Sequence, residues 1–206
     1  MQEVLLPRIR RLSRRELPAD TVALARFLIG ATLVHDLPDG RLSGRIVETE
    51  AYPPGDASGH AFPGLTRRNR SLFLTRGHAY VYLGYGLHYL LNVASERDGI
   101  GAGVLLRALE PLEGIAAMGQ RRGTLRLRDL ARGPGRLAQA MGVDLSDDGI
   151  DLTRDRSLWL GAPVRTAGPI GCSVRIGITK EVDRPLRFFE RENPFVSGSR
   201  HLNGQR

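Results

Sequence analysis

The sequence contains almost no lysine and almost no cysteine. Lys180 is the single lysine among 206 residues, so the other basic side chains apart from histidine are arginines. A Schiff-base mechanism through a lysine amine would have this one residue to use. Cys172 is the single cysteine, which excludes an internal disulfide and a zinc site built from several thiolates.

Long apolar runs and paired histidines are missing as well. No apolar stretch is long enough to span a bilayer, and the arginine-containing start of the chain lacks the apolar centre of a signal peptide. The five histidines show no two-histidine helical spacing of the kind found in zinc enzymes. We therefore expect a soluble, cytoplasmic protein with no membrane partner, no metal and no other cofactor.

Positive charge is in excess. The formal net charge is +8, which points to a polyanionic partner, either nucleic acid or an acidic membrane surface. A basic but otherwise ordinary soluble protein is the alternative, and the arginine-rich segment 121–132 fits a solvated face. Arg136 follows a glycine-rich stretch before a predicted helix, where free backbone donors at a helix start can bind phosphate.

Length and composition fit one domain. A chain of 206 residues with 41% hydrophobic residues can bury a substantial core. We expect a single domain over residues 1–206, in which residues 1–11 and 198–206 are flexible tails. We also expect a monomer.

The predicted elements favour a mixed α/β (α+β) fold with one curved, mainly antiparallel sheet and surrounding helices. Strands are predicted over residues 31–37, 45–52, 78–84, 87–94, 104–109, 174–178 and 186–189. Helices are predicted over residues 19–28, 112–120 and 137–141. Turns at 38–40 and 84–86 join neighbouring strands into antiparallel hairpins, the second of which protrudes. Residues 53–70 form a long loop, and such loops in compact domains are usually functional.

The strand ending at Tyr52 carries two acids and an aromatic ring. Residues two apart on a strand share a face, so Ile46, Glu48, Glu50 and Tyr52 are expected on one side. Two carboxylates beside a tyrosine are disfavoured in a core, which makes the wall of a pocket the better interpretation. Glu50 is preferred as the reactive group because it stands next to Tyr52 on that face. For Glu48 a salt bridge to an arginine stays open.

The tyrosines are concentrated in one window. All five lie between positions 52 and 89, together with His60 and the arginine cluster at 67–70. Tyr80 and Tyr82 share a strand face, where core packing and stacking on a nucleobase are both open. Tyr85 stands between two glycines at a hairpin tip, where it either folds back or inserts into a partner as a wedge.

Several of these segments together resemble one family, the alkyladenine DNA glycosylases, also called 3-methyladenine or methylpurine DNA glycosylases. The similar segments are residues 44–52, 68–70, 80–82, 85–86 and 104–114, together with Asn92, 133–134 and 184–188. The similarity extends over about residues 12–197. It implies an enzyme of base-excision repair that acts on double-stranded DNA. Such an enzyme flips an alkylated or deaminated purine out of the duplex and hydrolyses its N-glycosidic bond.

The resemblance also implies roles for single residues in a base-binding pocket. Glu50 matches the residue that activates water for attack on the sugar C1′. Tyr52 and Tyr82 match the rings that sandwich the flipped base, and His60 closes this stack. The backbones of Ala51 and His60 would bond the base edge.

Other matched residues contact DNA or select the base. Asn92 matches the residue that discriminates against the exocyclic amine of guanine. Tyr85 matches the residue that fills the gap left by flipping, and Arg107 matches one near the flipped nucleotide's phosphate. The remaining candidates for DNA contact are Arg68, Arg70, Tyr80 and Arg136.

Two other functions fit parts of the sequence. A non-catalytic, tyrosine-rich module that binds single strands or RNA loops would use the rings and the charge, but it would not need Glu50. A hydrolase of small nucleosides would not explain Tyr85 or the charge of +8. Because Lys180 is the single lysine, we expect a monofunctional glycosylase that leaves an intact abasic site.

Overall fold

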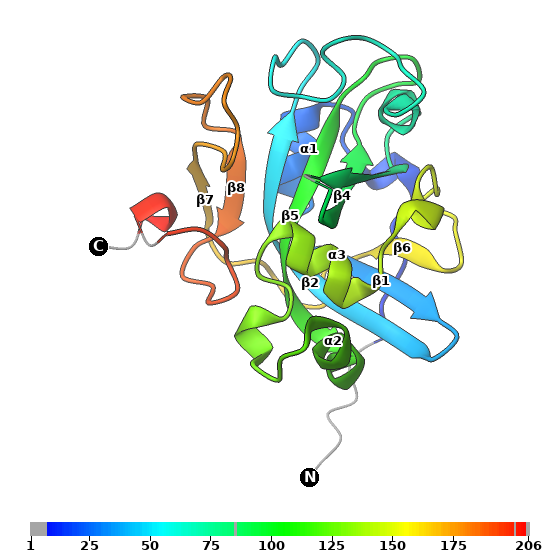
Figure 1. Cartoon of the computed structure of the whole chain (residues 1–206), viewed down its shortest axis with the longest axis vertical. Helices are drawn as coiled ribbons and strands as arrows, with labels where there is room; N and C mark the ends of the chain where they lie inside the picture. The colour runs from blue at the N-terminus through cyan, green and yellow to red at the C-terminus, as the bar shows by residue number, and fades with distance from the viewer. Residues whose placement is uncertain (1–7, 85, 200, 205–206) are drawn as a thin grey trace.

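Two long strands form the middle of the structure, a computed structural model that describes residues 8–84, 86–199 and 201–204 (Figure 1). They are β2 (Gly40–Tyr52) and β5 (Gly103–Glu113). Their antiparallel pairing runs from Ser43 opposite Glu113 to Tyr52 opposite Gly103. The end of β2 that carries the candidate residues therefore lies at the start of β5.

The other strands extend this pair into one curled antiparallel sheet of eight strands within the described residues. The order is β3-β4-β5-β2-β1-β6, and β8 pairs with both β2 and β7. The strands are β1 (Thr32–Leu37), β3 (Ala79–Gly84), β4 (His88–Ala94), β6 (Leu158–Gly161), β7 (Ile170–Ser173) and β8 (Arg187–Glu190).

One edge of β2 is shared by two strands. β1 pairs with residues 40–45 of β2, and β8 pairs with Glu48, Thr49 and Glu50. Between them, the backbone of Ile46 bonds to Gly30 and Ala31. The sheet therefore divides at this point, and β7 and β8 stand apart on the left of Figure 1.

The alternation of faces along β2 is interrupted. Its register with β5 shifts between Ile46 and Glu48 and again between Glu48 and Thr49. Ile46 consequently packs into the main apolar core, whereas Glu48 bonds Arg107. The regular alternation that predicts a shared face for Ile46 and the acids does not hold through this stretch, because the register shifts on both sides of Glu48.

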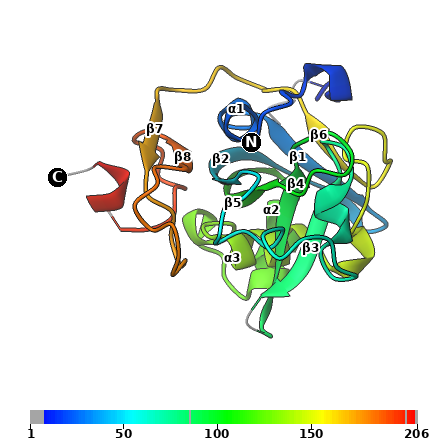
Figure 2. The ribbon, with the colours of Figure 1, turned by 90° about the horizontal axis from the view of Figure 1, so that it is seen from above.

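Helices cover both faces of the sheet: α1 (Thr21–Phe27) lies on one side, and α2 (Ile115–Arg122) and α3 (Pro134–Met141) lie on the other (Figure 2). The carboxylate of Asp20 caps α1 by accepting a hydrogen bond from the amide of Ala23 at 2.7 Å. Helix α3 begins three residues before its predicted start, with Pro134 in the first turn, which suits a residue that has no amide hydrogen.

The structure corrects one predicted helix boundary and one predicted strand. The helix predicted over 112–120 begins at Ile115, because β5 continues through Glu113. The strand predicted over 174–178 is wrong; the strand in this region is β7, which ends at Ser173. The amide of Ile176 bonds the carboxylate of Glu50 instead of a neighbouring strand.

The predicted hairpins are present as antiparallel pairs. β1 and β2 are joined through residues 38–39, and β3 pairs with β4 from Ala79 opposite Val93 to Gly84 opposite His88. Tyr85, the predicted wedge, lies outside the described residues. None of the helices in the described part of the chain is long and apolar enough to cross a bilayer.

The two ends of the described chain contact the sheet. Arg11 forms an isolated bridge with Gly161 in β6. Near the other end, in the segment expected to be a flexible tail, residues His201–Asn203 form a short 3-10 helix. Asn203 accepts a hydrogen bond from Arg187 at 2.8 Å.

Candidate active site

A cavity of about 480 Å³ lies where the end of β2, the start of β5 and the hairpin β3–β4 meet. Its lining also includes parts of the loop 53–62 and of the segment 176–180. Six of the predicted site residues line it: Tyr52, His60, Tyr82 and Asn92, which were predicted to bind the base, and Tyr80 and Arg107, which were predicted to contact DNA.

Glu50 is buried directly behind this lining, with no exposed surface. Its carboxylate accepts hydrogen bonds from the Ile176 amide at 2.8 Å and from the Tyr52 hydroxyl at 2.9 Å. The Arg107 guanidinium lies 3.2 Å away. All three partners line the cavity. The carboxylate is therefore held at the cavity wall by groups that themselves face the cavity.

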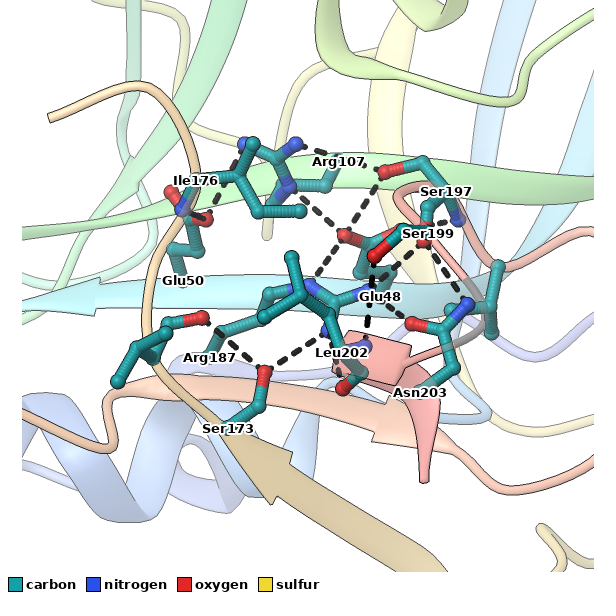
Figure 3. A network of polar contacts seen from close by, with 12 residues as sticks. Glu48, Glu50, Arg107, Ser173, Ile176, Arg187, Ser197, Ser199, Leu202 and Asn203 are labelled. Carbon is teal, nitrogen blue, oxygen red and sulfur yellow. Dashed lines mark hydrogen bonds and ion pairs between the residues drawn. The ribbon is translucent and has the colours of Figure 1, made fainter. Parts of the chain in front are cut away.

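Glu48 has a different environment, although it lies two residues away. It accepts hydrogen bonds from Arg107 Nε at 2.8 Å, Arg187 Nε at 2.7 Å, Ser197 N at 2.6 Å and Ser197 Oγ at 2.9 Å. Of these partners only Arg107 lines the cavity. Figure 3 shows Arg107 joining the two acids, with Ser197 and Arg187 on the side of Glu48. Glu48 thus links β2 to β8 and to the segment after it.

The two carboxyl groups titrate in opposite directions. Burial raises the pKa of Glu50 above its ordinary value, although Arg107 and the hydrogen bonds from Ile176 and Tyr52 oppose this. Burial also acts to raise the pKa of Glu48, but the charges of Arg107 and Arg187 outweigh it and lower that pKa below its ordinary value. The surrounding groups therefore shift the pKa values of two glutamates on the same strand in opposite directions.

The expectation that both acids lie in the wall of a pocket needs correction, because neither is among the residues that line the cavity. Glu48 and Glu50 are both fully buried, and their charge is offset by arginines from neighbouring strands. Unpaired carboxylates would be excluded from such a place, but paired and hydrogen-bonded ones are tolerated.

Tyr52 is fixed on three sides. Its hydroxyl donates to Glu50, and burial beside that carboxylate raises the pKa of Tyr52, so the hydroxyl stays protonated. The guanidinium of Arg175 lies over its ring, 4.6 Å from the centroid. Arg175 in turn forms a buried ion pair with Asp56 at 2.8 Å.

A second aromatic group lies on another side of the cavity. The rings of Tyr80 and Tyr82 are stacked with centroids 5.3 Å apart, and His60 lies 4.3 Å from Tyr82. The Nδ1 of His60 lies 2.9 Å from the hydroxyl of Tyr80. Burial and the charge of Arg68 lower the pKa of His60, which favours a neutral ring at pH 7. Tyr80 borders the cavity but has almost no exposed surface, so its ring mainly supports the ring of Tyr82.

Asn92 and Ala51 differ in their access to the cavity. Asn92 lies on its lining and donates to the carbonyl of Tyr80 at 3.3 Å. Ala51 is fully buried; its amide donates to Leu186 O at 2.8 Å, and its carbonyl accepts from Arg175 at 3.0 Å. The structure therefore does not bring Ala51 to the cavity surface, although the sequence predicted a contact with the base edge.

Comparison with known proteins follows this geometry. A family model described as methylpurine-DNA glycosylase matches residues 15–194. The chain belongs to this family. A relative from Mesorhizobium japonicum is 63% identical over 93% of this chain and 92% of its own. One from Paraburkholderia phytofirmans is 58% identical over 93% and 90%, and one from Methanoculleus marisnigri is 45% identical over 86% and 94%. All three carry the name "putative 3-methyladenine DNA glycosylase".

The chain is thus a DNA glycosylase, and its predicted DNA-contacting arginines differ in position. Arg68, Arg70 and Arg136 are exposed, and Arg68 donates to the carbonyl of Leu83 in the hairpin at 3.3 Å. Arg107 is buried between the two acids. Its predicted contact with a phosphate stays a prediction.

Sequence reasoning missed several residues that hold this glycosylase's cavity together. Arg175 and Asp56 support Tyr52, and Asn69 donates to the carbonyls of His60 and Gly64. The signal for Asn69 was its place inside the similar segment 68–70. For Asp56 and Arg175 the local sequence gives no signal, because the ion pair joins segments far apart in the chain.

Proposed function

We propose that this DNA glycosylase receives a flipped purine in the cavity and releases it with a water molecule activated by Glu50. The observation that carries the proposal is the position of Glu50, a buried carboxylate whose three polar partners all line one cavity. A raised pKa makes a carboxylate a better general base. The substrates proposed from the family resemblance are 3-methyladenine, 7-methylguanine, hypoxanthine and ethenoadenine in duplex DNA.

The aromatic rings support binding of an extruded base. Tyr52 and the Tyr82–His60 pair both line the cavity, so a flat base can stack between them. Flipping costs a few kcal/mol, and damaged or mismatched bases cost least. We assign Asn92 to discrimination against normal guanine, and Tyr85, with the exposed Arg68, Arg70 and Arg136, to DNA contact.

The chemical step follows from charge. Cleavage of an N-glycosidic bond passes through a state in which the sugar resembles an oxocarbenium ion. The carboxylate of Glu50 accepts a proton from water and also offsets positive charge on the sugar. Arg107 and the Ile176 amide hold one oxygen of that carboxylate, and the Tyr52 hydroxyl holds the other. The group is therefore oriented before the substrate arrives.

We propose a monofunctional enzyme that acts as a monomer. Lys180 lines the cavity, and its Nζ lies 5.9 Å from the ring centroid of Phe62. Placed over that ring, the ammonium group supports DNA binding through its charge. Borohydride trapping of a covalent enzyme–DNA adduct would contradict the monofunctional assignment.

The test is a matched pair of proteins, wild type and Glu50→Gln, on duplexes that each carry one damaged purine. The wild type is expected to leave alkali-labile abasic sites without added metal. Glu50→Gln keeps the size of the side chain and one acceptor oxygen but removes the charge, so it should bind the same DNA and lose at least about a hundredfold in base release. Wild-type binding without product from any of these purines would favour the non-catalytic binding module.

A further inference from the structure

The ring of Tyr52 has a cation on one face. The guanidinium carbon of Arg175 lies 4.6 Å from the ring centroid, and Arg175 is buried and does not line the cavity. Tyr52 itself does line the cavity. The ring therefore separates a buried positive charge from the space that a base would occupy.

Arg175 is held over the ring by a nearly complete set of hydrogen bonds. One terminal nitrogen donates to the Ala51 carbonyl at 3.0 Å and lies 2.8 Å from Asp56 Oδ2. The other donates to Asp56 Oδ1 at 3.3 Å and to the Glu181 carbonyl at 3.4 Å. The Nε has no partner among the described residues. A lysine ammonium group has neither the planar shape nor the forked donors for this arrangement.

Asp56 does not depend on Arg175 alone. Its carboxylate also accepts hydrogen bonds from the amide and the hydroxyl of Ser58 and from Arg184 at 3.2 Å. A neutral side chain at position 175 would therefore leave Asp56 with partners. This makes substitution of Arg175 a usable test, because no buried carboxylate loses all of its donors.

We propose that Arg175 is a positioning and specificity-determining residue, which fixes the Tyr52 ring and limits the preference of the cavity for positively charged purines over neutral ones. The inference rests on the proposed function. An aromatic face attracts a cation through the negative charge of its π system. A guanidinium already bound to one face weakens that attraction on the other, and the two positive charges also repel each other.

The substrates of the two kinds differ in charge. Methylation at N7 of guanine or N3 of adenine leaves the purine in DNA with a positive charge, whereas hypoxanthine is neutral. Arg175 should therefore weaken the binding of the methylated purines relative to hypoxanthine, and both kinds still stack on the same ring. In an enzyme that removes both kinds of damage, Arg175 would bring the rates of release of the methylated purines and of hypoxanthine closer together.

The test compares kcat/KM for a duplex with 7-methylguanine and a duplex with hypoxanthine. In Arg175→Gln, which is neutral, the ratio of the two values should rise about threefold or more. Arg175→Lys keeps a positive charge but loses the flat contact, so kcat/KM should fall about tenfold for both duplexes while their ratio stays near that of the wild type. A matched control is Arg11→Gln, since Arg11 also lies 4.6 Å from an aromatic ring, that of Trp159, which is not part of the cavity lining.

The outcomes are distinct. A folded Arg175→Gln protein with the wild-type ratio overturns the charge effect, and an Arg175→Lys protein with unchanged kcat/KM overturns the positioning role. If Arg175→Gln does not fold, Arg175→Met supplies the neutral side chain, and the same ratio decides. A wild-type protein that releases neither base would overturn the proposed function itself, whatever the variants do.

Discussion

At the scale of single residues, Glu48 and Glu50 show how environment divides two identical side chains. Glu48 is surrounded by donors from Arg107, Arg187 and Ser197, and these lower its pKa. Burial dominates at Glu50 and raises its pKa. The first acid is therefore stabilised as an ion, whereas the second is held in a less favourable ionised state. Ionisable groups whose charged form is disfavoured in this way are more often found at functional sites.

This contrast predicts opposite phenotypes for a pair of substitutions. Glu48→Gln leaves Arg187 buried without a compensating charge and leaves Arg107 with Glu50 alone, so the free energy of unfolding should fall by about 3 kcal/mol or more. Glu50→Gln removes a charge that burial disfavours, so the loss should be less than about 1 kcal/mol while base release is abolished. Urea unfolding and single-turnover base release measure the two effects. Equal destabilisation by both substitutions would contradict the assignment.

The pH dependence of catalysis gives a second prediction at this scale. As the proposed general base, Glu50 must be ionised to accept a proton from water, so kcat/KM should fall as the pH decreases through its pKa. Because burial raises the pKa of Glu50 in the free enzyme, this acid limb should lie above the ordinary value of 4.5. DNA binding measured over the same pH range separates loss of catalysis from loss of affinity. An acid limb below 4.5 would argue against Glu50 as the base.

At the scale of elements, the loop between β2 and β3 is organised by one side chain. Asn69 donates to the carbonyls of His60 and Gly64 at 2.8 and 2.9 Å and accepts from the amide of Thr66 at 2.7 Å. Asn69 is buried, while His60 at the other end of this turn is exposed at the cavity. The conformation of the His60 segment therefore depends on three hydrogen bonds to one amide.

Asn69→Ala should loosen this segment without touching the base. KM for damaged DNA is expected to rise about tenfold with a smaller change in kcat, because three hydrogen bonds of about 0.5–1.5 kcal/mol each are lost. Gln139→Ala is the matched control, since its amide donates to the Arg121 carbonyl at 2.7 Å away from the cavity. Similar KM values for the two variants would show that the segment keeps its position without Asn69.

How far the sequence reveals the elements depends on whether their signals are local. The hairpin of β1 and β2 follows from residues 38–40, and the start of α1 follows from Asp20. The sequence predicts a strand over residues 174–178, but the structure has a loop there. Its actual conformation depends on the carboxylate of Glu50, more than a hundred positions away in the chain. Contacts of this kind leave no local pattern, which also explains why Arg175 and Asp56 were missed.

At the scale of the whole molecule, ion pairs attach β8 and the segments beside it to β2. Besides the Glu48 group, the buried Arg45 lies 2.5 Å from Glu190 and 3.2 Å from Glu110. The main apolar core reaches β8 through Phe188, and a small second cluster of Val47, Ala108, Phe189 and Val196 accompanies the ion pairs. This part of the molecule is therefore held by charge as well as by apolar packing.

Acid should consequently weaken the whole fold over a defined range. Burial acts to raise the pKa of Glu190, but the hydrogen bonds from Arg45, Gly168 and Asn193 outweigh burial and lower this pKa from 4.5 to about 2. A carboxyl group whose pKa is lower in the folded than in the unfolded protein stabilises the fold at pH values above its unfolded-state pKa. For Glu190 this contribution is lost as the pH falls from about 4.5 towards about 2. Denaturant unfolding at a series of pH values should show this loss, with a flatter profile in Glu190→Gln. Identical profiles would assign acid sensitivity to other groups, Glu48 first among them.

The hydrogen bonds from Ser197 to Glu48 have a consequence for the order of synthesis. The acids are on β2, whereas Arg187 and Ser197 follow Glu48 by 139 and 149 positions and leave the ribosome later. A nascent chain can therefore form the central strand pair long before the network behind the cavity is complete. A chain synthesised only to a point before Ser197 would lack groups that fix the carboxylates, so base release would begin only after Ser197 has been added.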